Sequence, residues 1–224
     1  ELYLYSKYQR LIDIKPDSLS RMDTNDMIFN LIESDKPFMV GRFGLTEIDT
    51  LIHYDNFLKM NSIEKIHEWS LTMRYPFSKN CILNDIHRQS GFYPVTKKTI
   101  SLFREEMISS MKNVDLLASW VKGECRYQNY MQNSRVCKLD FIEPYLSENP
   151  WSEALEGLKV LIVHPFTESI YYQYTQNRSN IFKDKKVLPK FELKLITAPQ
   201  TLPGDKYNFS NWFETLDSLM KEIK

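Results

Sequence analysis

The segment Gly41-Arg42-Phe43-Gly44 has the residue types and spacing of an anion-binding turn. It ends a short apolar run, and Glu47 comes three residues after the second glycine. The glycines allow close approaches that other residues resist, and Arg42 offers a fork of N–H donors that suits a phosphate or carboxylate. Glu47 can bind a divalent metal or a sugar hydroxyl. A structural alternative stays open, in which Arg42 pairs with a structural carboxylate and Glu47 only complements a helix dipole.

A second group of polar residues follows the apolar run 158–163. His164 ends that run, and Glu168 falls in the first turn of the helical pattern that comes next. Strand, loop and helix in this order form the layout of nucleotide sites, although GxGxxG and GxxxxGK[ST] are both absent. His164 is a candidate general base, or a candidate hydrogen-bond donor to a phosphate. The slightly favoured alternative is a partly buried histidine whose hydrogen bonds are only structural. Glu168 would repel a phosphate, so we expect it to contact a hydroxyl or a metal, or to complement the helix dipole.

Two weaker candidates come from the same part of the chain. Arg178 lies about two turns further along the helical pattern, and Thr201 lies in the Pro-bounded loop 197–204, which can cover a ligand. Ligands of α/β proteins bind beyond the carboxyl ends of the strands. We therefore expect the polar groups of both regions to lie at the same end of adjacent strands and to line one pocket.

Composition restricts the classes of function. The 224 residues contain 29 Lys and Arg against 29 Asp and Glu, so we expect no nucleic-acid partner, and any anion site must be local. Three widely spaced cysteines without a CxxC motif argue against a zinc site or disulfide scaffold and fit a reducing, cytoplasmic compartment. The longest apolar run, near 160–163, is far too short to span a bilayer.

Helical and strand patterns place these residues in an α/β fold. In the first half we expect a helix over 23–33 capped by Thr24 or Asn25, a short buried strand over 36–43, a helix from Thr46 with a Thr46–Asp49 capping box, a helix within 61–80, a helix over 98–111 and a strand over 114–120. In the second half we expect a fully buried strand over 158–165, a helix over 166–182, a strand over 191–199 and a helix over 207–224 capped by Ser210.

The β-α-β-α order of the second half predicts a Rossmann-like, mostly parallel sheet flanked by helices. We expect one domain over residues 1–224, with a helix-rich half over about 1–146 and a β-α-β-α half over about 147–224. Because a parallel unit that ends on a helix normally continues with another strand, we also expect the chain to be truncated at its C-terminus.

The turn at residues 41–47 resembles a known signature. "GRFGLTE" is similar to the R-[FIY]-G-D-G-E motif of bacterial glycosyltransferases of the GT-D fold, and it matches at Arg42, Gly44 and Glu47. The resemblance covers most of residues 24–204 and is nearest to proteins from capsule and exopolysaccharide gene sets, although only this first motif is specific. It implies a cytoplasmic enzyme that moves a sugar from a nucleoside-diphosphate sugar, first of all a UDP-sugar, to a glycan or lipid-linked glycan acceptor.

The resemblance also implies roles for the residues singled out above. The donor-binding set is Gly41, Arg42, Phe43, Gly44, Arg178 and Thr201, the catalytic set is Glu47, His164 and Glu168, and Glu47 is the ligand of Mn²⁺ or Mg²⁺.

One residue departs from the signature, because Leu45 stands where the motif has Asp. A single carboxylate with diphosphate oxygens binds Mg²⁺ or Mn²⁺ only weakly. Either another residue supplies a ligand, or the enzyme is metal-independent, or the site is catalytically dead. A non-catalytic sugar-nucleotide-binding or scaffolding protein on the same fold is therefore the rival interpretation. A phosphoryl or pyruvyl transferase is a third, and peripheral association with a membrane stays open.

Overall fold

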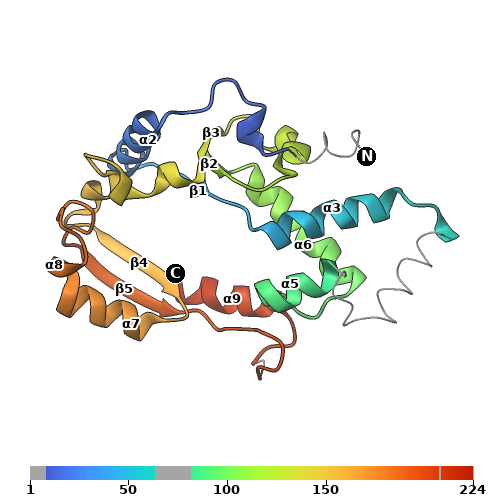
Figure 1. The fold of residues 1–224 in the computed structure, drawn as a ribbon. Coiled ribbons are helices and arrows are strands. Elements are labelled where there is room, and N and C mark those ends of the chain that lie inside the picture. Colours follow the sequence, from blue (N-terminus) through green and yellow to red (C-terminus); the bar gives the residue numbers. More distant parts are fainter. Residues whose placement is uncertain (1–8, 64–81, 207, 224) are drawn as a thin grey trace.

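The computed structural model describes residues 9–63, 82–206 and 208–223, and within them the chain is a mixed α/β protein with short parallel sheets flanked by helices (Figure 1). The described strands form two sheets, one in the order β1-β2-β3 and one of β4 and β5, and every pair is parallel. The predicted α/β class and parallel pairing are confirmed, whereas the strands are divided between two sheets instead of one.

The strands are β1 (Val40–Gly41), β2 (Leu116–Ser119), β3 (Arg135–Lys138), β4 (Lys159–His164) and β5 (Glu192–Thr197). The described α-helices are α2 (Arg21–Glu33), α3 (Leu45–Lys59), α5 (Ile82–Ser90), α6 (Lys97–Met111), α7 (Thr167–Tyr172), α8 (Arg178–Ile181) and α9 (Trp212–Ile223). Short 3₁₀ turns are η1 (Leu11–Asp13), η2 (Glu124–Tyr130), η3 (Leu139–Ile142), η4 (Pro144–Leu146) and η5 (Trp151–Leu155), and η6 (Gln173–Asn177) is a π-helical stretch between α7 and α8.

The first sheet is organised around β2, whose four residues are all buried. Beside it, β1 is a two-residue edge strand that is only half buried, and Phe38 and Met39 before it are 36% and 38% exposed. The prediction of a buried strand over 36–43 therefore overestimates both the length and the burial of this strand. An edge strand has a neighbouring strand on one side only, so it is less buried than a central strand. The strand predicted over 114–120 is confirmed, and β3, which lacks a clear sequence pattern, completes the sheet.

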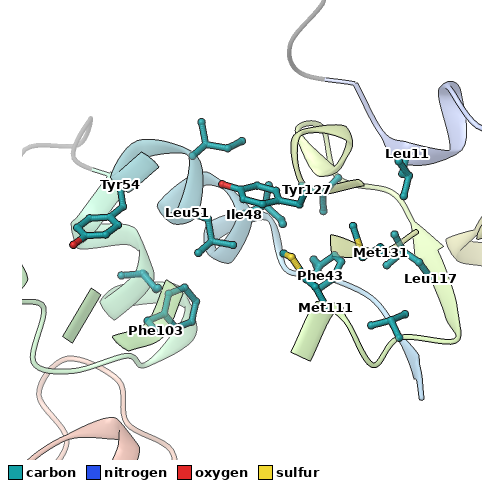
Figure 2. Close-up of a cluster of buried hydrophobic side chains, with 14 of the residues drawn as sticks. Leu11, Phe43, Ile48, Leu51, Tyr54, Phe103, Met111, Leu117, Tyr127 and Met131 are labelled. Atoms are coloured by element: carbon teal, nitrogen blue, oxygen red, sulfur yellow. The ribbon is translucent and has the colours of Figure 1, made fainter. Parts of the chain in front are cut away.

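The main core lies between α3, α6, β2 and η2 (Figure 2). Ile48, Leu51 and Ile52 of α3 are at most 4% exposed, as their helical spacing predicts. Tyr127 of η2 and Met111 of α6 pack in the same cluster. Helix α3, which begins directly after the 41–44 turn, is therefore fixed to the first sheet by its apolar face, and this fixes the turn as well.

Three predicted helix caps are wrong by a few residues. Ser20 caps α2, since its Oγ accepts the Asp23 N–H at 3.2 Å. Helix α3 already begins at Leu45, with Gly44 as its N-cap residue and without a side-chain cap. Before α9, the Asn211 Oδ1 accepts the Glu214 N–H at 3.1 Å, whereas the Ser210 hydroxyl donates to the Glu214 carboxylate at 2.6 Å. Several Ser, Thr, Asn and Asp residues precede each helix, and sequence alone does not rank them.

The second sheet is more exposed than predicted. The apolar residues of β4 are half buried, and Val163 is 38% exposed, so the prediction of a fully buried strand is wrong. The physical reason is that α7 and α9 both pack against β5, and the described part of the chain places no third strand beside β4. The helix predicted over 166–182 is present, with the π-helical stretch inside it.

Aromatic packing joins the two halves. The Phe92 ring, 2% exposed, lies 5.2 Å from the Phe103 ring and 5.6 Å from the Trp212 ring of α9. The backbone N–H of Trp212 donates to the Tyr93 carbonyl at 2.8 Å, and the Tyr93 and Thr215 hydroxyls share a 3.0 Å hydrogen bond.

Most of the helix predicted within 61–80 lies outside the described residues. Among the helices that are described, none is both long enough and apolar enough to cross a bilayer.

Candidate functional site

The turn after β1 holds Arg42 next to an aromatic side chain of the neighbouring strand. Arg42 is exposed, and its guanidinium carbon lies 5.8 Å from the centre of the Trp120 ring. Trp120 follows β2 directly, and its indole N–H donates to the Phe43 carbonyl at 2.7 Å. The Phe43 ring itself is 7% exposed and belongs to the core. The turn therefore exposes Arg42 to solvent, while the Phe43 side chain fixes the turn to the core.

A cavity of about 400 Å³ opens at the carboxyl ends of β2 and β3, where ligands of parallel sheets bind. Its lining residues come from η1, the strand ends and the chain that follows β3: Arg10, Ile12, Asp13, Ser18, Ser119, Trp120, Lys138, Leu139 and Asp140. Ser119 and Lys138 are register partners, so they lie side by side at this edge. The cavity volume falls within the usual range of small-molecule sites.

The cations around this cavity differ in their partners. Arg10 pairs with Asp13 at 2.7 Å, and this hydrogen bond lowers the pKa of the Asp13 carboxyl below its usual value. Arg21 likewise pairs with Asp140 at 2.7 Å. Neither Arg42 nor Lys138 forms an ion pair within the part of the chain that the structure describes. Each of them lies instead over an aromatic ring, Arg42 at 5.8 Å from the centre of Trp120 and Lys138 at 5.7 Å from the centre of Phe141.

A buried carboxylate supports the cavity from inside. Glu124 is 0% exposed, and its oxygens accept the N–H groups of Trp120 at 3.1 Å, Val121 at 3.0 Å and Leu11 at 3.2 Å, together with the Ser119 hydroxyl. The Ser119 oxygen in turn accepts the Ile12 N–H at 3.1 Å. One side chain thus connects the end of β2 to the segment around η1, and residues of both segments line the cavity.

Glu47 lies in the first turn of α3, directly after the same turn. Its carboxylate folds back over Gly44, since a Cβ atom at position 44 would lie 1.8 Å from Oε2 of Glu47. The Thr46 hydroxyl donates to that oxygen at 3.0 Å and also shares a 2.8 Å hydrogen bond with the Ser90 hydroxyl. Gly44 has φ −76°, which any residue adopts. The close approach of the Glu47 carboxylate, and not the backbone conformation, is what favours glycine here.

The loop after β5 reaches this region from the second half. The Thr201 hydroxyl donates to the Gly91 carbonyl at 2.7 Å, and Gly91 follows Ser90, the partner of Thr46. Gly91 has φ +67°, the left-handed conformation that favours glycine. Through Gly91 and Ser90 the structure links Thr201 to Thr46, the neighbour of Glu47, whereas the shared pocket stays a prediction. Ser90 and Gly91 belong to no recognised motif. Their Ser-Gly sequence indicates a turn but does not indicate the contact with Thr201.

His164 and Glu168 lie at the carboxyl end of the second sheet. The Nδ1 of His164 accepts the Phe166 N–H at 3.0 Å, so in the neutral imidazole the proton is on Nε2. His164 is half buried and packs edge-on against the exposed Phe166 ring at 5.4 Å. Glu168 is exposed in the first turn of α7. These contacts are those of a partly satisfied histidine, whose Nε2 has no hydrogen-bond partner among the residues that the structure describes.

Arg178 lies apart from the predicted site residues at the carboxyl ends of the strands. Its guanidinium donates to the Leu188 carbonyl at 3.1 Å, and its carbon lies 6.0 Å from the Tyr174 ring centre. Leu188 precedes β5, so Arg178 lies at the amino end of the second sheet, roughly 20 Å along six-residue strands from His164. The expectation that Arg178 shares one end of the strands with the others is wrong, because α7 and α8 carry it back along the sheet.

The carboxylates near the turn do not form a metal site of their own. Glu47 is the one carboxylate at the turn, and no three His, Cys, Asp or Glu side chains among residues 9–63, 82–206 and 208–223 form a metal-binding group. Asp49 faces Asp85 across the α3–α5 contact, where burial and then the Asp85 charge raise the pKa of Asp49. Because Mg²⁺ and Mn²⁺ take about six ligands, the described residues do not fit such an ion unaided, and no chemical step is assigned to one.

Sequence reasoning missed the residues around the cavity. Trp120 follows β2 and Lys138 ends β3, so both lie at strand ends, as Arg42 does. Strand β3 has no recognisable sequence pattern, and the sequence therefore does not point to Lys138. Glu124 follows a Gly with φ +100° in a region without periodicity.

Comparison of the chain with protein-family models, with curated proteins and with solved structures finds no match. The likeness to GT-D glycosyltransferases therefore rests on the residues of the turn.

Proposed function

We propose that this protein is a cytoplasmic glycosyltransferase of the GT-D type with a Rossmann-like donor site, acting in surface polysaccharide assembly. Its donor is a nucleoside-diphosphate sugar, first of all a UDP-sugar, and its acceptor is a glycan or lipid-linked glycan. The observation that carries the proposal is the pair of cations without ion-pair partners in the described chain, Arg42 and Lys138, on either side of Trp120 at the carboxyl ends of parallel strands.

Sugar transfer needs charge stabilisation and a base. The acceptor oxygen bonds to the anomeric carbon while the bond from that carbon to the diphosphate oxygen breaks, and the diphosphate leaves with the electron pair. Arg42 is placed to stabilise the negative charge that develops on the leaving group. The acceptor hydroxyl proton goes to a general base, for which His164 and Glu168 are the candidates at the end of β4. Glu47 holds a hydroxyl of the donor sugar.

A second candidate function is favoured by Leu45. This residue replaces the motif Asp and is 50% exposed at the first position of α3, beside the proposed donor site. A protein that binds sugar nucleotides without transferring the sugar needs Arg42 but not a second carboxylate. Release of UDP from a bound UDP-sugar in the presence of acceptor distinguishes the enzyme from this binding protein.

The first test is calorimetric titration of UDP, GDP, UDP-glucose and UDP-galactose, with and without Mn²⁺. We expect Arg42→Ala to weaken the binding of the preferred nucleotide about 10- to 100-fold, since hydrogen bonds to charged groups contribute about 1.5–3 kcal/mol. Arg135→Ala is the matched control, because Arg135 is an exposed arginine at the opposite end of the same sheet. Equal affinity in the two variants, or no binding of any nucleotide, would contradict the proposal.

A second prediction concerns Glu47. We expect Gly44→Ala to reproduce the loss of UDP-sugar affinity caused by Glu47→Gln, because the new Cβ displaces the Glu47 carboxylate, the mobile end of its side chain. The free energy of unfolding should change by less than about 1 kcal/mol, the usual range for a change of N-cap residue. Glu106→Gln, on the exposed face of α6, controls for loss of charge. If Glu47→Gln leaves both donor binding and transfer unchanged, the role given to Glu47 is wrong.

A further inference from the structure

We propose that the cavity at the carboxyl ends of β2 and β3 holds the nucleoside end of a nucleotide, with its base stacked on Trp120 and its phosphates between Arg42 and Lys138. The inference deepens the proposed function and rests on it for the sugar end of the ligand. It assigns a binding role to Trp120 and Lys138, which the turn motif does not include.

Trp120 has the properties of a preorganised stacking surface. Its side chain is 38% exposed and lines the cavity. The indole N–H is bound to the Phe43 carbonyl at 2.7 Å, and the backbone N–H is bound to the buried Glu124 at 3.1 Å. The ring is therefore held at both ends before a ligand arrives, and little side-chain entropy remains to be lost on binding. A large exposed ring fixed in this way offers a face to any nucleobase.

Two cationic side chains lie near Trp120. The Arg42 guanidinium lies over the ring, 5.8 Å from its centre, and Lys138 ends β3 beside Ser119, so the base stacks on the ring surface that Arg42 leaves open. The remaining arginines near the cavity, Arg10 and Arg21, are already paired with Asp13 and Asp140. A ligand that combines an aromatic ring with phosphates contacts both the ring and the two cations, Arg42 and Lys138, that form no ion pair among the described residues. Inorganic phosphates alone would satisfy only the cations.

The geometry also orients the ligand. Trp120 contacts the 41–44 turn at Arg42 and Phe43, whereas the Glu47 carboxylate folds over Gly44 and accepts from Thr46. A nucleoside on Trp120 and a diphosphate at Arg42 leave the sugar directed toward Glu47 and the Thr46–Ser90 hydrogen bond. The base therefore lies on the side of the first sheet, and the sugar lies on the side that Thr201 of the second half approaches.

The test compares UDP with inorganic pyrophosphate by calorimetric titration. We expect Trp120→Ala to weaken UDP binding about tenfold, the usual effect of losing one stacked base, and to change pyrophosphate binding less than about twofold. Lys138→Met should weaken both ligands at least about fivefold, since it removes a phosphate contact. Trp151→Phe is the matched control, because the Trp151 indole N–H also donates to a backbone carbonyl, that of Ile142 at 2.9 Å, but Trp151 does not line this cavity.

The outcomes test base stacking on Trp120 separately from the proposed sugar transfer. If UDP binding requires Arg42 but is unchanged in Trp120→Ala, or if both ligands weaken equally, the base does not stack on Trp120, while the transferase proposal stands. If UDP binding requires Trp120 but no sugar is transferred, this inference holds and the transferase proposal fails. Should Trp120→Ala not fold, Trp120→Phe decides, because UDP should quench tryptophan fluorescence in the unmodified chain and lose most of that quenching in the variant. Absence of UDP binding to the unmodified chain overturns the inference.

Discussion

Replacing Glu124 by alanine is expected to lower the free energy of unfolding by about 4 kcal/mol, since each buried donor that loses its acceptor costs about 1–3 kcal/mol. The change leaves three buried or half-buried N–H groups, those of Leu11, Trp120 and Val121, without their acceptor. It also removes the partner of the buried Ser119 hydroxyl. Urea denaturation followed by far-UV circular dichroism measures the effect.

Two further variants sharpen the Glu124 experiment. Glu124→Gln keeps one oxygen acceptor but turns an amide N–H₂ toward groups that are themselves donors, so a loss of about 2 kcal/mol is expected. Glu106→Gln removes a carboxylate from the exposed face of α6 and should change stability by less than about 0.5 kcal/mol. A Glu124→Ala variant within about 1 kcal/mol of the unmodified chain would show that the network adds little to stability. Weaker UDP binding in Glu124→Gln would further indicate that Glu124 positions Trp120.

The second large effect is expected at Gly91. An alanine there must keep φ +67°, and its Cβ would lie 2.5 Å from Oγ1 and 3.0 Å from the backbone oxygen of Thr201. Left-handed strain of about 1–2 kcal/mol and loss of the Thr201 hydrogen bond, about 1 kcal/mol, together give a destabilisation of about 3 kcal/mol. Because a backbone atom is involved, the 197–204 loop must move away from Ser90 and Glu47.

Gly157→Ala separates the strain at Gly91 from the contact with Thr201. Gly157 has φ +74°, and a Cβ atom there would meet nothing within 4 Å, so this variant carries the left-handed strain alone. Thermal unfolding should therefore show the smaller loss in Gly157→Ala, and amide exchange in the 197–204 loop should increase only in Gly91→Ala. Equal losses and equal exchange in the two variants would mean that the Thr201–Gly91 contact does not hold the loop.

The parts of the fold that sequence predicts are those with long or uninterrupted apolar patterns. Helix α6 was expected over 98–111 and spans Lys97–Met111, and β5 was expected over 191–199 and spans Glu192–Thr197. Strand β3 was missed because only its two central residues are buried, which is too short for a recognisable pattern. The burial of β4 was misjudged because apolar content does not reveal how many neighbours a strand has.

The candidate site was predictable only where a motif is local. The position of Arg42 at the end of a strand follows from the Gly-Arg-Phe-Gly segment itself, whereas its contact with Trp120 depends on β1 lying beside β2. No nearby residue specifies that pairing. The error at Arg178 has a geometric origin, since 11 residues of helix from Thr167 extend about 16 Å, enough to return to the far end of the sheet.

The parallel order β1-β2-β3 also has a consequence for how the first sheet assembles. Val40 and its partner Leu116 are 76 residues apart along the chain (116 − 40), whereas Leu116 and its partner Arg135 are 19 apart (135 − 116). Loop-closure entropy grows with the logarithm of length, and this fourfold difference makes the β1–β2 closure roughly 1.2 kcal/mol more costly. The ladder between β2 and β3 is therefore the entropically cheaper one to nucleate. Strand β1, which Arg42 follows, pairs with β2 at the greater entropic cost, because α3, α5 and α6 lie between the two strands in the sequence.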